Sequence, residues 1–348
     1  MSTFNKTPLI KKRWIIILFL LLFINLYHLP YYFSKPGDAN VLNTIIEVEG
    51  GYEDEGTFML TTVRMGKANI VNYLLAQISD TRELIHEEYI LRSGETDQEY
   101  HQRQLLMMSS SQDIATIVAY QQAGKEAYFQ NYGVLVTGMI EDMPAYDLLE
   151  LGDLIVTVND TQVKTVDELL AQLGDQQQNN KVSLSIIRDE QKSEVELFVT
   201  SFPEEVDPTG KRMGIGITSP ITKRELIISP NVTIDTKKIG GPSAGLMFSL
   251  EIYNQLVEED LTKGYNIAGT GTINEEGEVG RIGGVKQKVI AAERVGADFF
   301  FAPNEFNSKT SNYQEALEAS ELINGKMEIV PIDSFEDAIT FLENLEPK

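Results

Sequence analysis

The stretch Gly240-Gly-Pro-Ser-Ala-Gly245 leads directly into the apolar run Leu246-Met-Phe-Ser-Leu-Glu-Ile-Tyr253. Small residues around Ser243 let a substrate carbonyl approach the backbone closely. The apolar run is compatible with a helix, whose N-terminus presents free N–H groups and the positive end of its dipole. Such a terminus is suited to stabilise an oxyanion. The stretch therefore predicts an α/β domain with Ser243 as a nucleophile, although serine is also favoured at an ordinary helix N-cap.

The glycines at 241 and 245 also satisfy Gly-x-Ser-x-Gly, the nucleophile elbow of α/β-hydrolases. That arrangement needs a histidine after the serine, whereas His28, His86 and His101 all precede Ser243. The chain contains no cysteine, which excludes a thiol nucleophile, disulfides and cysteine-type zinc sites. A serine nucleophile in this chain must use another base, and a lysine with a lowered pKa is the usual substitute.

A candidate base lies in the stretch Arg281-Ile-Gly-Gly-Val-Lys-Gln-Lys288. Its two glycines predict a tight turn before a helix over 285–295, and Lys286 falls in the first turn of that helix. There the helix dipole disfavours a cation, which lowers the pKa of a lysine. We therefore expect Lys286 to be the general base and Lys288 to be solvated.

Three motifs occur in the order that Lon-type proteases carry them: Gly241-Pro-Ser-Ala-Gly245, Thr270-Gly271 and Ile282-Gly-Gly-Val-Lys-Gln-Lys-Val-Ile-Ala-Ala292. From about residue 214 to the C-terminus, the chain resembles the proteolytic domain of that family. The resemblance implies a catalytic dyad of Ser243 as nucleophile and Lys286 as base. It also implies that Thr270 orients the lysine. Thr272 stays open, either as a rival for that role or as a structural strand residue.

A nucleotide-binding P-loop is missing from the sequence. That motif needs Gly-Lys followed by Ser or Thr, whereas the four Gly-Lys pairs are followed by Ala68, Glu126, Arg212 and Met327. We therefore expect an ATP-independent enzyme without a cofactor, acting on flexible peptides or exposed loops because it cannot unfold a substrate. The acidic segment 49–55 does not follow the EF-hand pattern, so we expect a solvated turn there and no metal site.

Short predicted strands replace the helical pattern between about residues 121 and 202. The motifs of this block are Tyr132-Gly-Val-Leu-Val136, Met143-Pro-Ala145, Leu151-Gly-Asp-Leu-Ile155 and Val158-Asn-Asp160. Together they resemble a PDZ domain of the bacterial kind. The resemblance implies a groove in which a peptide adds as a strand beside a helix that starts at Val166. The expected groove residues are Gly133, Val134, Leu135 and Val136. The alternative is that the block is a structural spacer.

A basic cluster, Lys11-Lys-Arg13, immediately precedes an apolar stretch that continues to Phe33. About 20 residues suffice for a helix to cross a bilayer, and a basic flank stays in the cytoplasm. We therefore expect residues 1–33 to comprise a cytoplasmic start and a transmembrane anchor at the cell membrane. A cleaved signal peptide is the alternative. Either interpretation places the rest of the chain outside the cell.

The remaining sequence completes the predicted domain organisation. We expect a linker at 34–40 within an α/β region, 34–120, that flanks the PDZ-like domain. This region should contain two strands before residue 64 and mainly helix over 68–124. Residues 203–348 should form the proteolytic domain. The predicted fold class is therefore α+β multidomain, with an N-terminal transmembrane helix, a β-rich PDZ-like domain and a C-terminal α/β Lon-type domain.

The net charge of the 348-residue chain, −23 at pH 7, repels phosphate backbones, so we expect no nucleic acid partner. The whole arrangement resembles the membrane-anchored PDZ–Lon peptidases of Gram-positive bacteria (the SepM-like group). That resemblance implies limited proteolysis of extracellular or membrane-adjacent peptides and exposed protein segments, and it leaves a homo-oligomer open. Two alternatives remain: a non-catalytic surface scaffold that binds peptide tails through the PDZ-like groove, and an enzyme that cleaves only itself.

Overall fold

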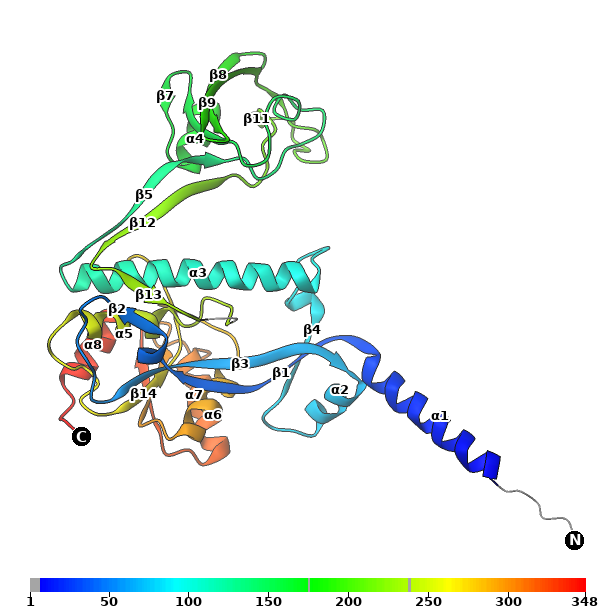
Figure 1. The fold of residues 1–348 in the computed structure, drawn as a ribbon, viewed down its shortest axis with the longest axis vertical. Helices are drawn as coiled ribbons and strands as arrows, with labels where there is room; N and C mark the ends of the chain where they lie inside the picture. Colours follow the sequence, from blue (N-terminus) through cyan, green and yellow to red (C-terminus); the bar gives the residue numbers. More distant parts are fainter. Residues whose placement is uncertain (1–6, 175, 237–238) are drawn as a thin grey trace, which may run out of the picture. The chain divides into compact units, whose positions relative to one another are not determined.

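The computed structural model describes residues 7–174, 176–236 and 239–348. The chain forms two compact units. The larger unit combines Met1–Ala127 with Ile228–Lys348, and the smaller is Tyr128–Ile227. The smaller unit is therefore an insertion within the larger one (Figure 1).

A six-stranded sheet with the order β18-β17-β14-β3-β1-β4 forms the centre of the larger unit. Its strands are β1 (His28–Val41), β3 (Thr57–Asn69), β4 (Glu83–His86), β14 (Asn266–Gly269), β17 (Phe299–Pro303) and β18 (Glu328–Ile332). The four strands from β3 to β18 pair in parallel, whereas β1 is antiparallel to β3 and β4. Because β3 precedes the insertion and β14 follows it, both parts of the unit share one sheet.

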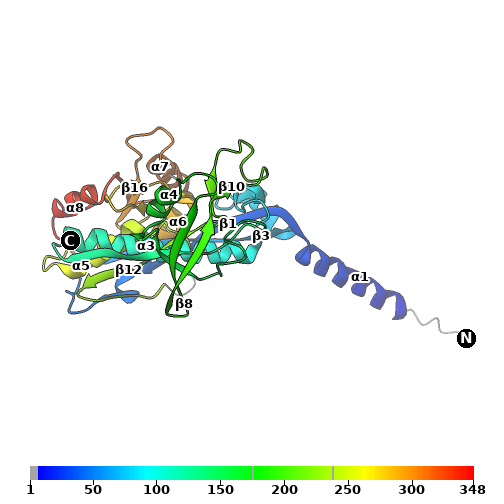
Figure 2. The ribbon, with the colours of Figure 1, turned by 90° about the horizontal axis from the view of Figure 1, so that it is seen from above.

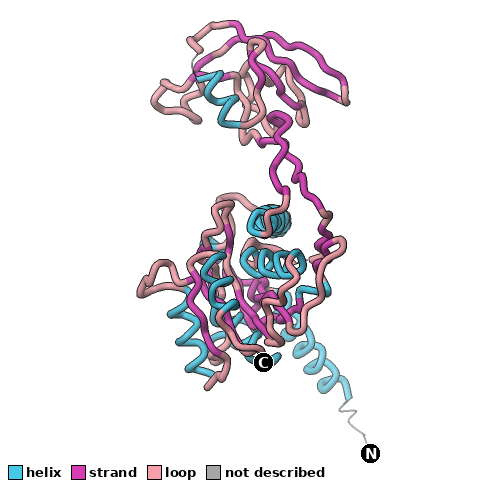
Figure 3. Tube along the Cα trace, turned by 90° about the vertical axis from the view of Figure 1, so that its left-hand side faces the viewer, coloured by secondary structure: helices cyan, strands magenta, loops and turns pink. Residues whose placement is uncertain are grey.

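Helices surround this sheet, and α5 and α6 lie against its strands (Figure 3). The helices are α1 (Thr7–Leu26), α2 (Ile70–Gln77), α3 (Asp97–Gln122), α5 (Gly245–Leu256), α6 (Val285–Val295), α7 (Asn312–Ile323) and α8 (Phe335–Glu343), with 3-10 turns η1 (Leu42–Thr44) and η2 (Glu87–Tyr89). Two small ribbons pair β2 (Ile46–Val48) with β13 (Val232–Ile234) and β15 (Thr272–Ile273) with β16 (Val279–Gly280). α5 and α6 both contact β3 and β14, and α3 lies along α5 (Figures 1 and 2).

Local sequence sets the ends of the helices that carry the site. α3 starts with a capping box formed by Thr96 and Glu99. α6 begins after Gly284 and ends before Gly296, and both glycines have left-handed backbone angles, with φ of 73° and 74°. Glycine adopts that conformation without a steric penalty. The helix predicted over 285–295 is therefore confirmed.

The smaller unit is a β-rich domain with its own core. Its sheet has the order β12-β5-β6-β8-β9, with β7 paired to β6. Its elements are β5 (Glu126–Leu135), β6 (Leu154–Val158), β7 (Thr161–Gln162), α4 (Val166–Gly174), β8 (Lys181–Arg188), β9 (Gln191–Phe198), β10 (Thr200–Ser201), β11 (Met213–Gly214) and β12 (Ile221–Ser229). Buried side chains such as Val134, Ile155, Leu169 and Leu184 pack together in its core.

The predicted linker at residues 34–40 and the predicted end of the anchor at Phe33 are both wrong. α1 ends at Leu26, and β1 then runs from His28 to Val41. Aromatic residues of this stretch favour strands, and Phe33 pairs with residues of both β3 and β4. Pro36 is tolerated because the register of β1 shifts between Pro36 and Ala39.

Residues 1–6 of the predicted anchor segment lie outside the described residues. In α1, the structure describes the side chains from Trp14 onward, except that of Ile16. Within the described part of the chain, no helix has the length and apolarity that a membrane crossing requires.

Two predicted domain boundaries need correction. Residues 34–120 do not form a separate flanking region, because β1, β3 and α3 belong to the same unit as the segment after residue 228. Residues 203–227 belong to the smaller unit rather than to the proteolytic domain, since β11 pairs with β10 and Ile215 lies in that core. Contacts between residues far apart in sequence decide both boundaries. The region predicted as mainly helical contains α2 and α3 but also β4.

The position of the insertion predicts that the larger unit folds without it. β5 and β12, which lead into and out of the insertion, are neighbours in a sheet, so their strands run about 5 Å apart. Replacing residues 128–227 with a short glycine-serine linker should leave one cooperative thermal transition and the circular-dichroism signal of the helices. Loss of that transition would show that the insertion is needed for the fold.

Candidate active site

Ser243 lies in the loop that joins β13 to α5, one residue before the Ala244 N-cap. Its side chain is half-buried, and its backbone carbonyl accepts hydrogen bonds from the Gly271 amide and the Thr270 hydroxyl, each at 2.9 Å. These bonds hold the carbonyl toward the end of β14. The hydroxyl of Ser243 is then free to face α6.

The side chain that reaches Ser243 is that of Lys288. Its Nζ donates to Ser243 Oγ at 2.7 Å and to Thr270 Oγ1 at 2.8 Å. Lys288 is only 3% exposed, and this burial lowers its pKa to about 7. A buried ammonium is disfavoured because it loses its hydration, so a large fraction of Lys288 is neutral near pH 7. The site thus contains a serine hydroxyl and a lysine that is suited to act as its base.

The prediction that Lys286 is the base is wrong, as is the prediction that Lys288 is solvated. Lys286 is half-buried and lines a separate hollow with Arg82 and Glu315, not the cleft that contains Ser243. Residues two apart on a helix point to nearly opposite sides, about 200° apart. Only one of the two lysines can therefore face the serine.

Helical periodicity is the signal that could have identified Lys288. The face of α6 that packs on the sheet carries Val285, Val289 and Ala292. Position 288 belongs to the same i, i+3, i+4, i+7 stripe, whereas position 286 does not. A lysine on the apolar stripe of a helix is buried, and burial is the condition that lowers its pKa.

Thr270 is placed where the resemblance implied. It follows β14 directly, is fully buried, and donates from its hydroxyl to the Ser243 carbonyl while it accepts from Lys288. Thr270 therefore fixes the position of the lysine amine relative to the serine. Thr272 lies in β15 and lines the cleft, and no hydrogen bond joins it to Lys288 among the described residues. Of the two threonines, Thr270 is therefore the one that contacts the lysine amine.

α3 holds the loop before Ser243, a contribution that the sequence analysis missed. The Ser111 hydroxyl donates to the Pro242 carbonyl at 3.0 Å, and the Gly241 amide donates to the Gln104 carbonyl at 2.8 Å. Ser111 is 4% exposed. Nothing local in the sequence of α3 signals this contact, because α3 and the loop are separated by more than 100 residues.

A cleft of about 750 Å³ opens beside Ser243 and Lys288. Its apolar lining includes Leu60, Val63, Met65, Ile85, Ile90, Met108, Ile239 and Ile282, and its carboxylates are those of Asp38 and Glu83. Residues from both sides of the insertion therefore build one cleft. Its apolar lining with a few polar groups is typical of a ligand-binding cleft.

The predicted peptide groove of the smaller unit is not where the resemblance implied. β5 lies between β6 and β12 in the sheet, and β6 already pairs with Val134 and Leu135. Thr222 of β12 also accepts a hydrogen bond from the Val166 amide at 3.0 Å, at the start of α4. The groove residues are otherwise structural. Gly133 has a φ of 150°, Leu135 pairs with Leu154, and the side chains of Val134 and Val136 lie in the core.

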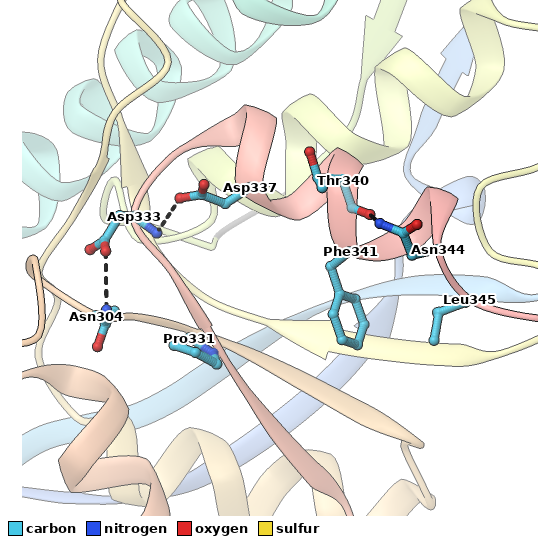
Figure 4. A pocket seen from close by; sticks show the side chains of 8 residues that line it. All are labelled: Asn304, Pro331, Asp333, Asp337, Thr340, Phe341, Asn344 and Leu345. Atoms are coloured by element: carbon cyan, nitrogen blue, oxygen red, sulfur yellow. Dashed lines mark hydrogen bonds between the residues drawn. The ribbon is translucent and has the colours of Figure 1, made fainter.

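A second hollow lies along α8 (Figure 4). Its polar groups are paired with one another: Asn304 donates to Asp333 at 3.0 Å, and the Asp333 amide donates to Asp337 at 3.1 Å. Asp337 also belongs to the capping box of α8 with Ser334. These contacts explain the hollow as part of a helix start. Among the described residues, no group of histidine and carboxylate side chains is arranged to hold a metal ion.

Comparisons with known proteins agree with this arrangement. Residues 108–199 match the PDZ domain family, and residues 230–343 match the Lon protease (S16) C-terminal proteolytic domain family. The Lon protease of Aster yellows witches'-broom phytoplasma (strain AYWB) is 31% identical over 100 residues, covering 29% of this chain and 12% of that protein. Lon protease homolog 2, peroxisomal, of Caenorhabditis briggsae is 36% identical over 107 residues, covering 31% of this chain and 13% of that protein.

The similarity to these relatives is partial, since the matched part spans only 12% and 13% of their lengths. Among solved structures, the PDZ domain of the SdrC-like protein from Listeria monocytogenes is 25% identical over 26% of this chain and 88% of that chain. Its TM-score of 0.23 is too low to carry an argument about the fold. The chain thus combines a PDZ domain with a Lon-type C-terminal proteolytic domain, and the second places it among the serine peptidases.

Proposed function

We propose that the chain is an ATP-independent serine endopeptidase with a Ser243–Lys288 dyad, acting by limited proteolysis on peptides and exposed protein segments outside the cell. The observation that carries this proposal is the 2.7 Å hydrogen bond between Lys288 Nζ and Ser243 Oγ inside a buried site. A lysine with a pKa of about 7 has the base strength that general-base catalysis needs near neutral pH.

The reaction is acyl transfer in two stages. Neutral Lys288 takes the proton of Ser243 Oγ as this oxygen bonds to the scissile carbonyl carbon. The carbonyl oxygen becomes an oxyanion, which backbone amides near the N-terminus of α5 stabilise. The Lys288 ammonium then returns the proton to the leaving amine as the C–N bond breaks. Water hydrolyses the resulting ester by the same proton route and frees Ser243.

Thr270 acts as a positioning residue in this scheme. Its hydroxyl contacts both the Lys288 amine and the Ser243 carbonyl, so it bridges the base and the nucleophile loop. With this contact in place, Lys288 remains directed at Ser243 whether or not it carries the extra proton. A fixed geometry of this kind contributes to catalysis because the reacting groups need not reorganise.

Independence from ATP is proposed because the sequence carries no P-loop and because the dyad needs no nucleotide for its chemistry. Without an unfolding motor, the cleft can accept only segments that are already extended. We therefore propose flexible peptides and exposed loops as substrates. The scaffold alternative is weaker, because the chain's own β12 occupies the place where peptide tails were expected to bind.

We also propose that α1 anchors the chain at the cell membrane. The chain would then belong to the SepM-like group of membrane-anchored peptidases. The described apolar side chains of α1 are exposed, including Trp14, Phe19 and Leu26. A helix that is apolar on all sides needs an apolar environment. The basic residues 11–13 precede these side chains and favour a cytoplasmic N-terminus, which would place the cleft outside the cell.

The dyad predicts a clear difference between the two neighbouring lysines. We expect Ser243→Ala and Lys288→Ala to lower kcat/KM for an unstructured peptide by about 100-fold or more, as loss of nucleophile or base does. Lys286→Ala serves as the matched control and should keep near-parent activity. Cleavage would be followed by mass spectrometry without ATP, using residues 27–348 so that β1 stays complete. Loss of activity in Lys286→Ala but not in Lys288→Ala would refute the assignment.

The pKa of Lys288 predicts the pH dependence of cleavage. Only the neutral amine can accept the serine proton, so protonation at low pH removes the base. We expect kcat/KM to fall about tenfold per pH unit well below pH 7 and to reach a plateau above it. Measuring kcat/KM from pH 5 to 9 tests this. A profile without a break near neutral pH would contradict the role of Lys288.

The contact from α3 predicts that Ser111 positions the nucleophile loop. Ser111→Ala leaves the half-buried Pro242 carbonyl without its donor, an effect of about 1–3 kcal/mol. We expect kcat to fall about tenfold, which corresponds to ~1.4 kcal/mol, while KM changes little. The exposed neighbour provides a control, Ser110→Ala, which should behave like the parent. Equal changes in both variants, or a change in KM alone, would argue against positioning by Ser111.

A further inference from the structure

α2 exposes an apolar stripe where a helix of a folded domain normally buries one. Val71, Leu74 and Leu75 are spaced as i, i+3 and i+4 on one face of α2, and Ile78, the C-cap residue directly after the helix, continues this spacing as i+7. Their exposures are 42%, 59%, 38% and 82%, and α2 contains no buried residue. Tyr73, by contrast, contacts the ring of Tyr31 in β1. The body of the protein therefore holds the other side of α2, and no described residue covers the apolar stripe.

The charge pattern around α2 sets it apart from the rest of the chain. No charged residue occurs between Lys67 and Asp80, although the whole chain carries a net charge of −23. Charged side chains favour contact of a helix with water, and this segment contains none of them. The stripe therefore resembles the apolar face of a helix that lies at the surface of a bilayer.

The stripe is continuous with α1. The two helices contact each other, and Asn69, the N-cap of α2, donates from its side chain to the Asn25 carbonyl at 3.1 Å and to the Asn25 side chain at 3.0 Å (Figure 1). Near this junction, Phe23 and Leu26 of α1 are 57% and 61% exposed. The environment that covers the apolar surface of α1 must therefore extend to α2.

We propose that α2 is a membrane-interface helix, whose stripe of Val71, Leu74, Leu75 and Ile78 inserts into the headgroup region of the bilayer beside α1. This proposal rests on the anchoring by α1 proposed above. A lipid surface is favoured over a second protein because α1 adjoins the stripe and its described side chains before Asn25 are all apolar.

The position of α2 gives this contact a consequence for the reaction. α2 packs on β1, β3 and β4, and the same strands supply Ser34, Met65 and Ile85 to the wall of the cleft. Seating α2 in the interface therefore holds one wall of the cleft close to the bilayer. The favoured substrates are then peptide segments that are themselves tethered to the membrane.

The chain allows a direct test, because it contains one tryptophan and no cysteine. Trp14 reports on α1. A single cysteine introduced by Ile78→Cys and labelled with an environment-sensitive fluorophore reports on α2, and Phe306→Cys provides a matched control, since Phe306 is 80% exposed. Each full-length variant is reconstituted into phosphatidylcholine–phosphatidylglycerol vesicles, with and without lipid that carries a nitroxide quencher near the headgroup.

We expect the fluorophore at position 78 to shift to the blue and to be quenched at least about twofold more than that at position 306, because the stripe lies at headgroup depth. Quenching of Trp14 without quenching at position 78 would overturn the inference and leave the anchor intact. If Trp14 is not quenched either, the proposed anchoring itself fails. A blue shift at position 78 that depends on protein density and not on the nitroxide would assign the stripe to a second copy of the chain.

A second measurement links the stripe to the reaction. The variant Leu74→Gln/Ile78→Gln should cleave a soluble peptide like the parent but should cleave the same peptide attached to a lipid about fivefold or more slowly, because seating on the bilayer is weakened. Equal loss on both substrates would show that α2 is only structural and would overturn the inference. Unchanged cleavage of both would also overturn it.

Discussion

The parallel pairing of β3 with β14 is the contact on which the active site depends. It places Leu60 opposite Gly269, and the Thr61 hydroxyl donates to the Gly269 carbonyl at 3.0 Å. The chain leaves the sheet directly after this residue, at Thr270, which touches both members of the dyad. Since β3 precedes the insertion and β14 follows it, the site forms only when the two separated parts of the larger unit share a sheet.

The chemistry of the site follows from burying one amine. Moving a charged ammonium out of water is costly unless it is paired, and the polar atoms that the Lys288 amine contacts are the hydroxyls of Ser243 and Thr270. No carboxylate contributes to the shift of its pKa, which burial alone lowers. Burial therefore favours the neutral form of the Lys288 amine. The same packing that makes α6 part of the core thus supplies the base.

The segment before the insertion is a full part of the peptidase unit rather than a connection to it. β1 and β3 form walls of the cleft, α3 holds the loop that carries Ser243, and α2 exposes the surface that we assign to the membrane. In the smaller unit, β12 completes the sheet beside β5. The chain's own strand therefore lies beside β5, where the resemblance placed a bound peptide.

Sequence alone determined the course of α6 and the presence of both domain types, and it indicated Ser243 and Thr270 as candidates, because short motifs and glycine positions act locally. It misassigned β1 as a linker, since pairing with distant strands overrides the local signal of Pro36. The helix dipole favoured Lys286, whereas the apolar stripe of the same helix carries Lys288. Both lysines lie in one helix, and the tertiary packing, which turns one face of α6 toward β1, β3 and β14, brings the amine of Lys288 against Ser243.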